Sequence, residues 1–101
     1  MKLLVGLCAG LLLPAVARAQ EEAVVEQLAP VLAAEDAREW QQDLFQRALL
    51  APDSVVRRVA ALAAGRIGDL RATPLLLRTL DQPDSTARVA AAFALGLLLS
   101  V

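Results

Sequence analysis

The chain has 101 residues, which is enough for one ordinary domain at most. Hydrophobic residues make up 57% of it but aromatic residues only 3%, so the apolar content is mainly alanine, leucine and valine. This mixture favours closely packed helices over a sheet, in which β-branched and aromatic residues are preferred. The formal net charge of −1 gives no basic excess and so argues against a nucleic-acid partner.

The first 19 residues have the layout of a secretory signal peptide. A basic start at Lys2 precedes an apolar run over residues 3–13, Pro14 follows, and residues 17–19 fit a small-x-small cleavage site. The run is shorter than the roughly 20 residues of a membrane-spanning helix. We expect cleavage after Ala19 and a periplasmic or secreted protein without stable membrane insertion; an uncleaved anchor is the alternative.

Removal of residues 1–19 would change the chemistry of the chain. Lys2 and Arg18 would be lost, leaving eight arginines against eleven acidic residues and a net charge of −3. Cys8, the only cysteine, would be lost as well. The mature chain would therefore have no disulfide, no thiol nucleophile and no cysteine ligand for zinc.

A repeat of 31 residues runs through the rest of the chain. When the sequence is shifted by 31 residues, residues 52–65 lie over residues 83–96, and eight of these 14 positions are identical. They include a Pro, an Asp, an Arg and a Gly, which an alanine-rich composition alone would not align. The segments 44–49 and 75–80 keep the same register. A fixed period of this length is the signature of a solenoid.

Each unit is predicted to contain two helices. In the second unit, a short apolar helix over residues 75–80 is followed by a turn and by a helix that Asp84 or Ser85 caps. This helix is expected to stop near Gly96, because glycine readily takes the left-handed conformation that ends helices. The segment 65–69 is the corresponding turn after the first unit.

The first unit is predicted to follow the same plan. Asp36 and Glu39 resemble a capping box for a helix that includes Trp40, and Asp53 or its neighbour Ser54 caps the next helix. Trp40 is read as part of the packing stripe of its helix, with a role as an interface anchor as the alternative.

Upstream of these units, residues 20–35 are predicted to form a degenerate leading helix. Glu22 falls in register with Asp53, and Pro30 is expected to kink or interrupt the helix. The acidic character of this end suits a polar cap of the stack. The predicted organisation is a signal peptide over 1–19, a leading helix over 20–35, a first unit over 36–69 and a second unit over 70–101.

Residues 56–69, with the leucine-rich helix and the acidic turn that follow, resemble the bacterial HEAT-repeat pattern. They are also similar to the HEAT-like repeats of phycobilin lyases. The resemblance implies an all-α fold, a short right-handed α-solenoid of HEAT-like helix pairs used for protein–protein contact. In HEAT repeats an Asp of the turn and an Arg of the next helix commonly form a ladder, and the matching residues here are Asp53 with Arg57 and Asp84 with Arg88.

The ladder arginines are read as structural, each within reach of the capping Asp four residues earlier. The chain has no His and no Tyr, and it shows neither a glycine-rich phosphate loop nor a nucleophile elbow. Four acidic residues of the leading end lack the loop spacing of a calcium site and are read as a solvated face: Glu35, Asp36, Glu39 and Asp43. We therefore expect no catalytic, cofactor or metal site.

The sequence thus predicts a non-catalytic interaction or scaffolding module with a protein partner. The resemblance leaves a bilin-lyase-like or chaperone-like enzyme subunit as the alternative. The C-terminal segment 89–101 is apolar except at Ser100, although a terminal repeat ordinarily has a polar outer face. Such a surface indicates either a piece of a longer repeat array or self-association through this helix.

Overall fold

The computed structural model of the chain describes residues 2–100, with side chains described from Pro14 onward. Met1 of the predicted signal peptide therefore lies outside the described residues. Residues 2–100 contain five α-helices, one 3₁₀ turn and no strand, which confirms the all-α prediction. The elements are α1 (Lys2–Ala37), α2 (Gln42–Leu49), α3 (Ser54–Ile67), the 3₁₀ turn η1 (Leu70–Ala72), α4 (Thr73–Thr79) and α5 (Ser85–Leu99).

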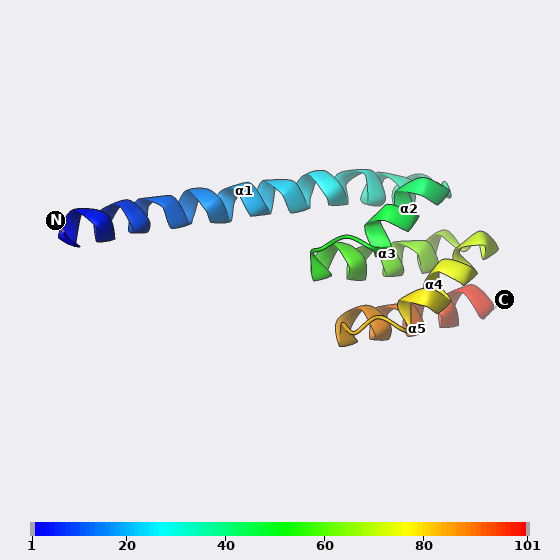
Figure 1. Cartoon of the computed structure of the whole chain (residues 1–101). Helices are drawn as coiled ribbons and strands as arrows, with labels where there is room; N and C mark the ends of the chain where they lie inside the picture. The colour runs from blue at the N-terminus through cyan, green and yellow to red at the C-terminus, as the bar shows by residue number, and fades with distance from the viewer. Residues whose placement is uncertain (1, 101) are drawn as a thin grey trace.

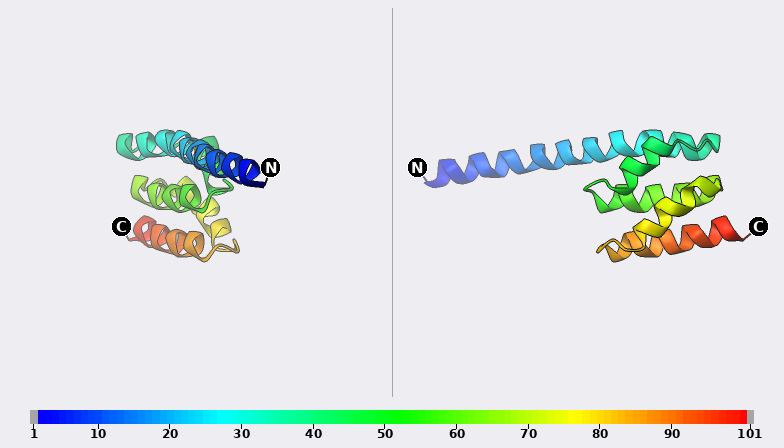
Figure 2. Two further views of the ribbon diagram at one scale, coloured as in Figure 1. Left: turned by 90° about the vertical axis from the view of Figure 1, so that its left-hand side faces the viewer. Right: turned by 45° about the vertical axis from the view of Figure 1, so that its right-hand side comes forward.

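The helices form two layers. The long helices α1, α3 and α5 lie side by side in one layer, and the short helices α2 and α4 lie in the other (Figures 1 and 2). Helix α2 packs on α3 and α4 packs on α5, so each unit is a helix pair. The N-terminal part of α1 extends well beyond the other helices, and the molecule measures 65 × 28 × 18 Å (Figure 1).

Aspartates begin the two long helices of the units, as the sequence predicts. Asp53 Oδ1 accepts a hydrogen bond from the backbone N–H of Val55 at 2.8 Å, and Asp84 Oδ1 accepts one from Thr86 at 3.0 Å. These bonds satisfy backbone donors that a helix start otherwise leaves unpaired. Gly68, with φ of 79°, ends α3 in the left-handed conformation.

Two predicted helix ends are wrong. Helix α5 continues through Gly96 to Leu99, because the leucines that follow are good helix formers and Leu98 is buried by the continued helix. Helix α3 likewise continues through Gly65, so the turn after the first unit begins at Gly68. Both glycines match the stop pattern in sequence, but only the packing around a glycine decides whether a helix ends there.

The leading helix differs from the prediction as well. Helix α1 continues through Pro14 and Pro30, so an interruption at Pro30 is wrong. Val31 and Ala34, just after this proline, are buried against the other helices, and this packing holds the helix together past the hydrogen bond that proline cannot make.

The predicted capping box is also wrong, because Asp36 lies in the last turn of α1 and α2 begins only at Gln42. Arg38 takes the left-handed conformation (φ 52°), and the N–H of Glu39 donates to the carbonyl of Ala34 at 2.9 Å. This is the Schellman pattern of a helix end. The sequence signal for a start therefore marks the end of the preceding helix.

Trp40 lies in the linker between α1 and α2 rather than in a helical packing stripe. Its ring stacks on Phe45, with ring centroids 4.8 Å apart and an interplanar angle of 13°. Its Nε1–H donates to Gln42 Oε1 at 3.0 Å. Trp40 therefore covers the start of α2 and the buried Phe45 from outside.

The core between α3 and α5 consists mainly of alanine. Ala60, Ala61, Ala91 and Ala94 are all fully or almost fully buried, and the small side chains let the two helices approach closely. A Cβ atom placed on Gly65 would lie only 2.7 Å from both Cα and Cβ of Ala94. The contact between α3 and α5 therefore requires glycine at position 65.

The two aligned glycines make a matched pair of tests. Gly65→Ala should destabilise the fold by about 1–3 kcal/mol, because its methyl group meets the α5 backbone. Gly96→Ala should stabilise it by roughly 0.5–1 kcal/mol, because nothing lies within 4 Å of the added atom and alanine favours a helix interior. Urea unfolding followed by circular dichroism measures both, and equal effects of the same sign would contradict the close helix contact.

Candidate functional site

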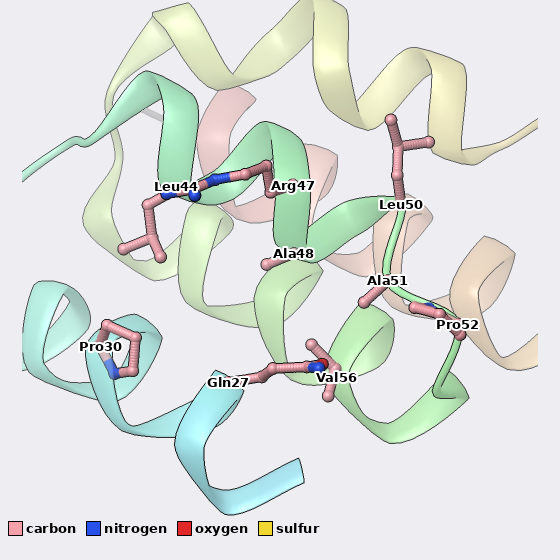
Figure 3. A pocket seen from close by; sticks show the side chains of 9 residues that line it. All are labelled: Gln27, Pro30, Leu44, Arg47, Ala48, Leu50, Ala51, Pro52 and Val56. Atoms are coloured by element: carbon pink, nitrogen blue, oxygen red, sulfur yellow. The ribbon is translucent and has the colours of Figure 1, made fainter. Parts of the chain in front are cut away.

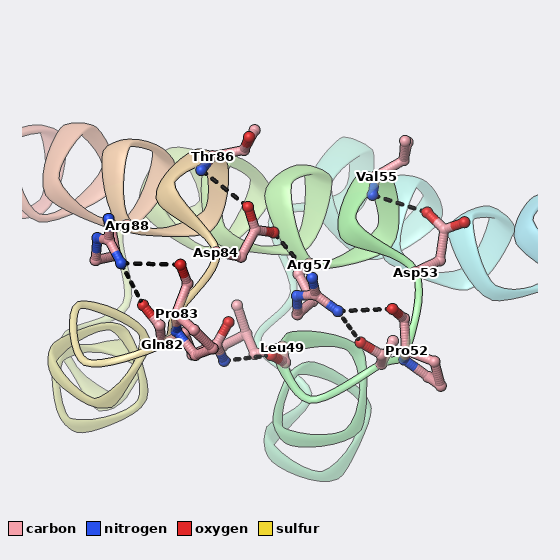
Figure 4. A network of polar contacts seen from close by, with 11 residues as sticks. Leu49, Pro52, Asp53, Val55, Arg57, Gln82, Pro83, Asp84, Thr86 and Arg88 are labelled. Atoms are coloured by element: carbon pink, nitrogen blue, oxygen red, sulfur yellow. Dashed lines mark hydrogen bonds and ion pairs between the residues drawn. The ribbon is translucent and has the colours of Figure 1, made fainter.

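A row of polar contacts joins the turns that precede α3 and α5 (Figure 4). Arg57 Nη1 donates to the carbonyl oxygens of Ala51 and Pro52, at 2.6 and 2.8 Å. Its Nη2 donates to Asp84 Oδ2 at 2.9 Å, and both side chains are only 18% exposed. One guanidinium therefore ties its own turn to the aspartate that caps the helix of the next unit.

Arg88 repeats half of this arrangement. Its Nη1 donates to the carbonyl oxygens of Gln82 and Pro83, at 2.9 and 3.0 Å, in the register of the Arg57 contacts (Figure 4). In the described part of the chain no carboxylate forms an ion pair with Arg88. The second half of the Arg57 arrangement is thus missing at Arg88.

Of the four predicted ladder residues, the structure brings together Arg57 and Asp84. The same-unit pairs, Asp53 with Arg57 and Asp84 with Arg88, are not among the ion pairs of residues 14–100, so the expected spacing of four residues is wrong. Arginine side chains on a helix lean toward its N-terminus. They reach the turn carbonyls there, and the stacking of the units brings Asp84 to the free edge of Arg57.

The largest pocket, of about 500 Å³, lies between α1, α2 and the loop before α3 (Figure 3). Its walls are mostly apolar, and Arg47 is the only charged residue that lines it. In the 31-residue register, Leu44 and Arg47 correspond to Leu75 and Arg78, which face α2 across a small gap. The pocket thus lies where a preceding short helix would pack, and no acid–base pair lines it.

A second hollow, of about 450 Å³, runs between α3 and α5. Leu62, Val89 and Phe93 form its apolar part, and Arg58 lies at its edge. Val89 is 70% exposed and Phe93 is 57% exposed. Phe93 matches Leu62 in the repeat, and the sequence pattern places both in the core, so the prediction that Phe93 supplies core bulk is wrong. The alternation of alanine with larger residues does not show which face of α5 has a neighbour.

The acidic residues at the leading end do not gather into a site. Glu35 Oε1 accepts from Arg66 Nη1 at 3.0 Å, which joins the end of α1 to the end of α3. Among the residues that the structure describes, no group of three or more His, Cys, Asp or Glu side chains could hold a metal ion. None of the described helices is both long and apolar enough to cross a membrane.

Comparison with known families now accounts for this geometry. A family model described as HEAT repeats matches residues 11–96, which takes in both helix pairs and most of α1. The chain belongs to the HEAT-repeat family. Comparisons with curated proteins and with solved structures give no match. HEAT repeats generally mediate protein interaction and are usually non-catalytic scaffolds, which agrees with apolar hollows that lack paired acids and bases.

Within this HEAT stack, the Arg57 guanidinium lowers the pKa of Asp84 below its ordinary value by hydrogen bonding to the carboxylate. Desolvation acts in the opposite direction, and the backbone N–H of Thr86 adds to the lowering. Because the folded pKa lies below the unfolded one, the pair stabilises the fold above the unfolded pKa. This contribution is lost as the pH falls through the folded pKa.

A second exposed pair lies in the loop between the HEAT units, where Asp69 caps η1. Arg71 donates to both oxygens of this carboxylate, at 3.0 and 2.7 Å, and its backbone N–H donates at 2.9 Å. These bonds lower the pKa of Asp69 to about 2. The pair is local to the turn and lies outside both hollows.

The pairing between units can be tested through the pKa of Asp84. Arg57→Gln should raise this pKa toward its ordinary value, because the main lowering contact is removed. Arg88→Gln, the matched control on the same helix, should leave it unchanged, because Arg88 binds turn carbonyls instead. Carboxyl-carbon NMR titration measures both variants. A larger shift in Arg88→Gln would restore the same-unit pairing.

Proposed function

We propose that the chain is a non-catalytic interaction or scaffolding module, exported from the cytoplasm, whose HEAT pairs form a short right-handed α-solenoid. The observation that carries this proposal is the hollow between α3 and α5. It exposes Val89 and Phe93 on the layer of long helices, where a solenoid usually binds its partners. Burial of a side chain such as Phe93 by a partner would contribute about 1.5–3 kcal/mol.

The lining of this hollow suggests the chemistry of its partner. Leu62 and Phe93 offer an apolar surface, and Arg58 adds a cation at the edge. The hydroxyl groups of Ser85 and Thr86 lie along the same hollow. We therefore propose that it binds a protein segment in which an apolar side chain stands next to an aspartate or glutamate.

The lining also favours binding over catalysis. Arg58 is the only ionisable side chain in the hollow, and an arginine stays protonated in proteins. General acid–base catalysis needs a group that can release and take up a proton. No described contact favours the alternative of a lyase-like or chaperone-like enzyme subunit.

The binding surface can be tested with a displayed library of random peptides. The wild-type chain should enrich peptides with an apolar residue beside an acidic one, and Phe93→Ser should lose this binding. Phe93 is 57% exposed, so its replacement should leave the fold intact. Leu77→Ser is the control, because Leu77 is similarly exposed on α4, outside the hollow. Failure to enrich such peptides, or equal binding by Phe93→Ser, would overturn the proposal.

The proposal of export rests on the layout of residues 1–19 and is compatible with the packing of α1. Residues 14–23 are exposed, and Val24 is the first described side chain that is partly buried. Cleavage after Ala19 would therefore leave the described packing of α1 intact. The bare outer face of α5 supports a further part of the proposal, that the stack continues as a longer array or by self-association.

Export predicts a defined N-terminus. In a bacterial host the chain should accumulate outside the cytoplasm with Gln20 as its first residue, and intact mass spectrometry of the periplasmic fraction measures this. Ala19→Arg should block cleavage, because the signal peptidase requires a small residue there. Retention of full-length wild-type chain in the cytoplasm would refute export without affecting the proposed binding surface.

A further inference from the structure

The outward face of α5 repeats the surface on which α5 itself packs. Helix α3 presents Arg57, Ala61 and Gly65 toward α5, and both Ala61 and Gly65 are buried there. Thirty-one residues later, α5 carries Arg88, Ala92 and Gly96 in the same positions, and these three are exposed. The chain therefore ends its stack with a copy of its own internal contact surface.

The two glycines show that this copy is open. A Cβ at Gly65 would meet Ala94 at 2.7 Å, whereas a Cβ at Gly96 would meet nothing within 4 Å. A row of small residues beside an arginine permits a second helix to approach as closely as α5 approaches α3. Arg88 already donates to its turn carbonyls as Arg57 does, but it lacks the carboxylate that Arg57 finds in Asp84.

These contacts define what a helix must offer to this face. It needs a carboxylate near its start for Arg88, in the position of Asp84. It also needs small side chains farther along for Gly96, in the position of Ala94. The interior contact between α3 and α5 supplies both requirements from one helix.

The leading helix of the same chain meets them. Glu22 lies 31 residues before Asp53 and so occupies the register position of the capping carboxylates. Ala29 and Ala33 are small and exposed on the same helix, and Val25 is 63% exposed. At 100° per residue, Glu22, Ala29 and Ala33 share one face of α1, on the side away from the buried Val31.

We propose that α5 of one copy packs against α1 of a second copy, so that the chain assembles head to tail with Arg88 bound to Glu22 of its neighbour. This inference deepens the self-association included in the proposed function and rests on it. The two faces are different surfaces of the molecule, so the contact does not close on itself after two copies. The product is an open stack of copies in which each junction extends the internal repeat.

A symmetric contact between two α5 helices satisfies Arg88 less well. Asp84, the nearest carboxylate in the chain sequence, is already bound to Arg57 and only 18% exposed. An α5–α5 contact would bring two arginines and no free carboxylate of α5 into one interface. Charge complementarity therefore favours α1 as the occupant.

Sedimentation velocity of the full chain over a range of concentrations tests the assembly. The wild type should form a series of oligomers larger than a dimer. Arg88→Glu should weaken association by roughly tenfold or more, because repulsion from Glu22 replaces attraction. Gly96→Leu should block it without loss of stability, because the added side chain fills the contact face only in the assembly. Arg58→Glu changes the net charge identically on the α3 side of the hollow and should leave assembly unchanged.

A charge-exchange experiment identifies the two faces. Glu22→Arg alone should also weaken association, and a mixture of Glu22→Arg chains with Arg88→Glu chains should restore it, because each junction then pairs opposite charges. A monomeric wild type, or assembly that Arg88→Glu leaves intact, would overturn the proposal. Association that stops at a dimer and ignores Glu22→Arg would overturn it in favour of the symmetric contact. Peptide binding through Phe93 is measured independently, so its failure is distinguishable from failure of the assembly.

Discussion

The close contact of α3 with α5 is the constraint on which the rest of the structure depends. Gly65 has no room for a Cβ because Ala94 lies directly against it, and this fixes both the distance and the register of the two helices. Alanines on both sides fill the remaining space with little bulk. In such an interface the gain comes from many short contacts rather than from a few large side chains, so shape tolerates little change.

The polar row follows from that register. Once Gly65 and Ala94 are aligned, Asp84 at the start of α5 lies beside Arg57, two helical turns before Gly65, and the 2.9 Å pair forms between units. The carboxylate also caps α5, so one side chain begins a helix and joins it to its predecessor. Such a partly exposed pair contributes modestly to stability, but its geometry matches only one alignment of the units.

The sequence predicts the local features of this fold better than the contacts between units. The 31-residue period, the caps at Asp53 and Asp84 and the all-α class can be read from residue types, because each depends on neighbours in the chain. The partner of Arg57, the exposure of Phe93 and the continuation of α5 past Gly96 depend on which helix lies alongside. An identical Gly at positions 65 and 96 has opposite surroundings, and only the stack distinguishes them.

Helix geometry separates the two surfaces that α5 leaves open. Successive residues of a helix point about 100° apart, so Phe93 faces the hollow beside α3 while Ala92 and Gly96 face away from the stack. A partner held in the hollow would therefore leave Arg88 and its row of small residues free. Since the row copies the surface around Gly65, a helix that packs there also completes a new hollow beside Val89 and Phe93. Extension of the stack and binding in its hollows are thus compatible, and each added junction increases the number of binding surfaces.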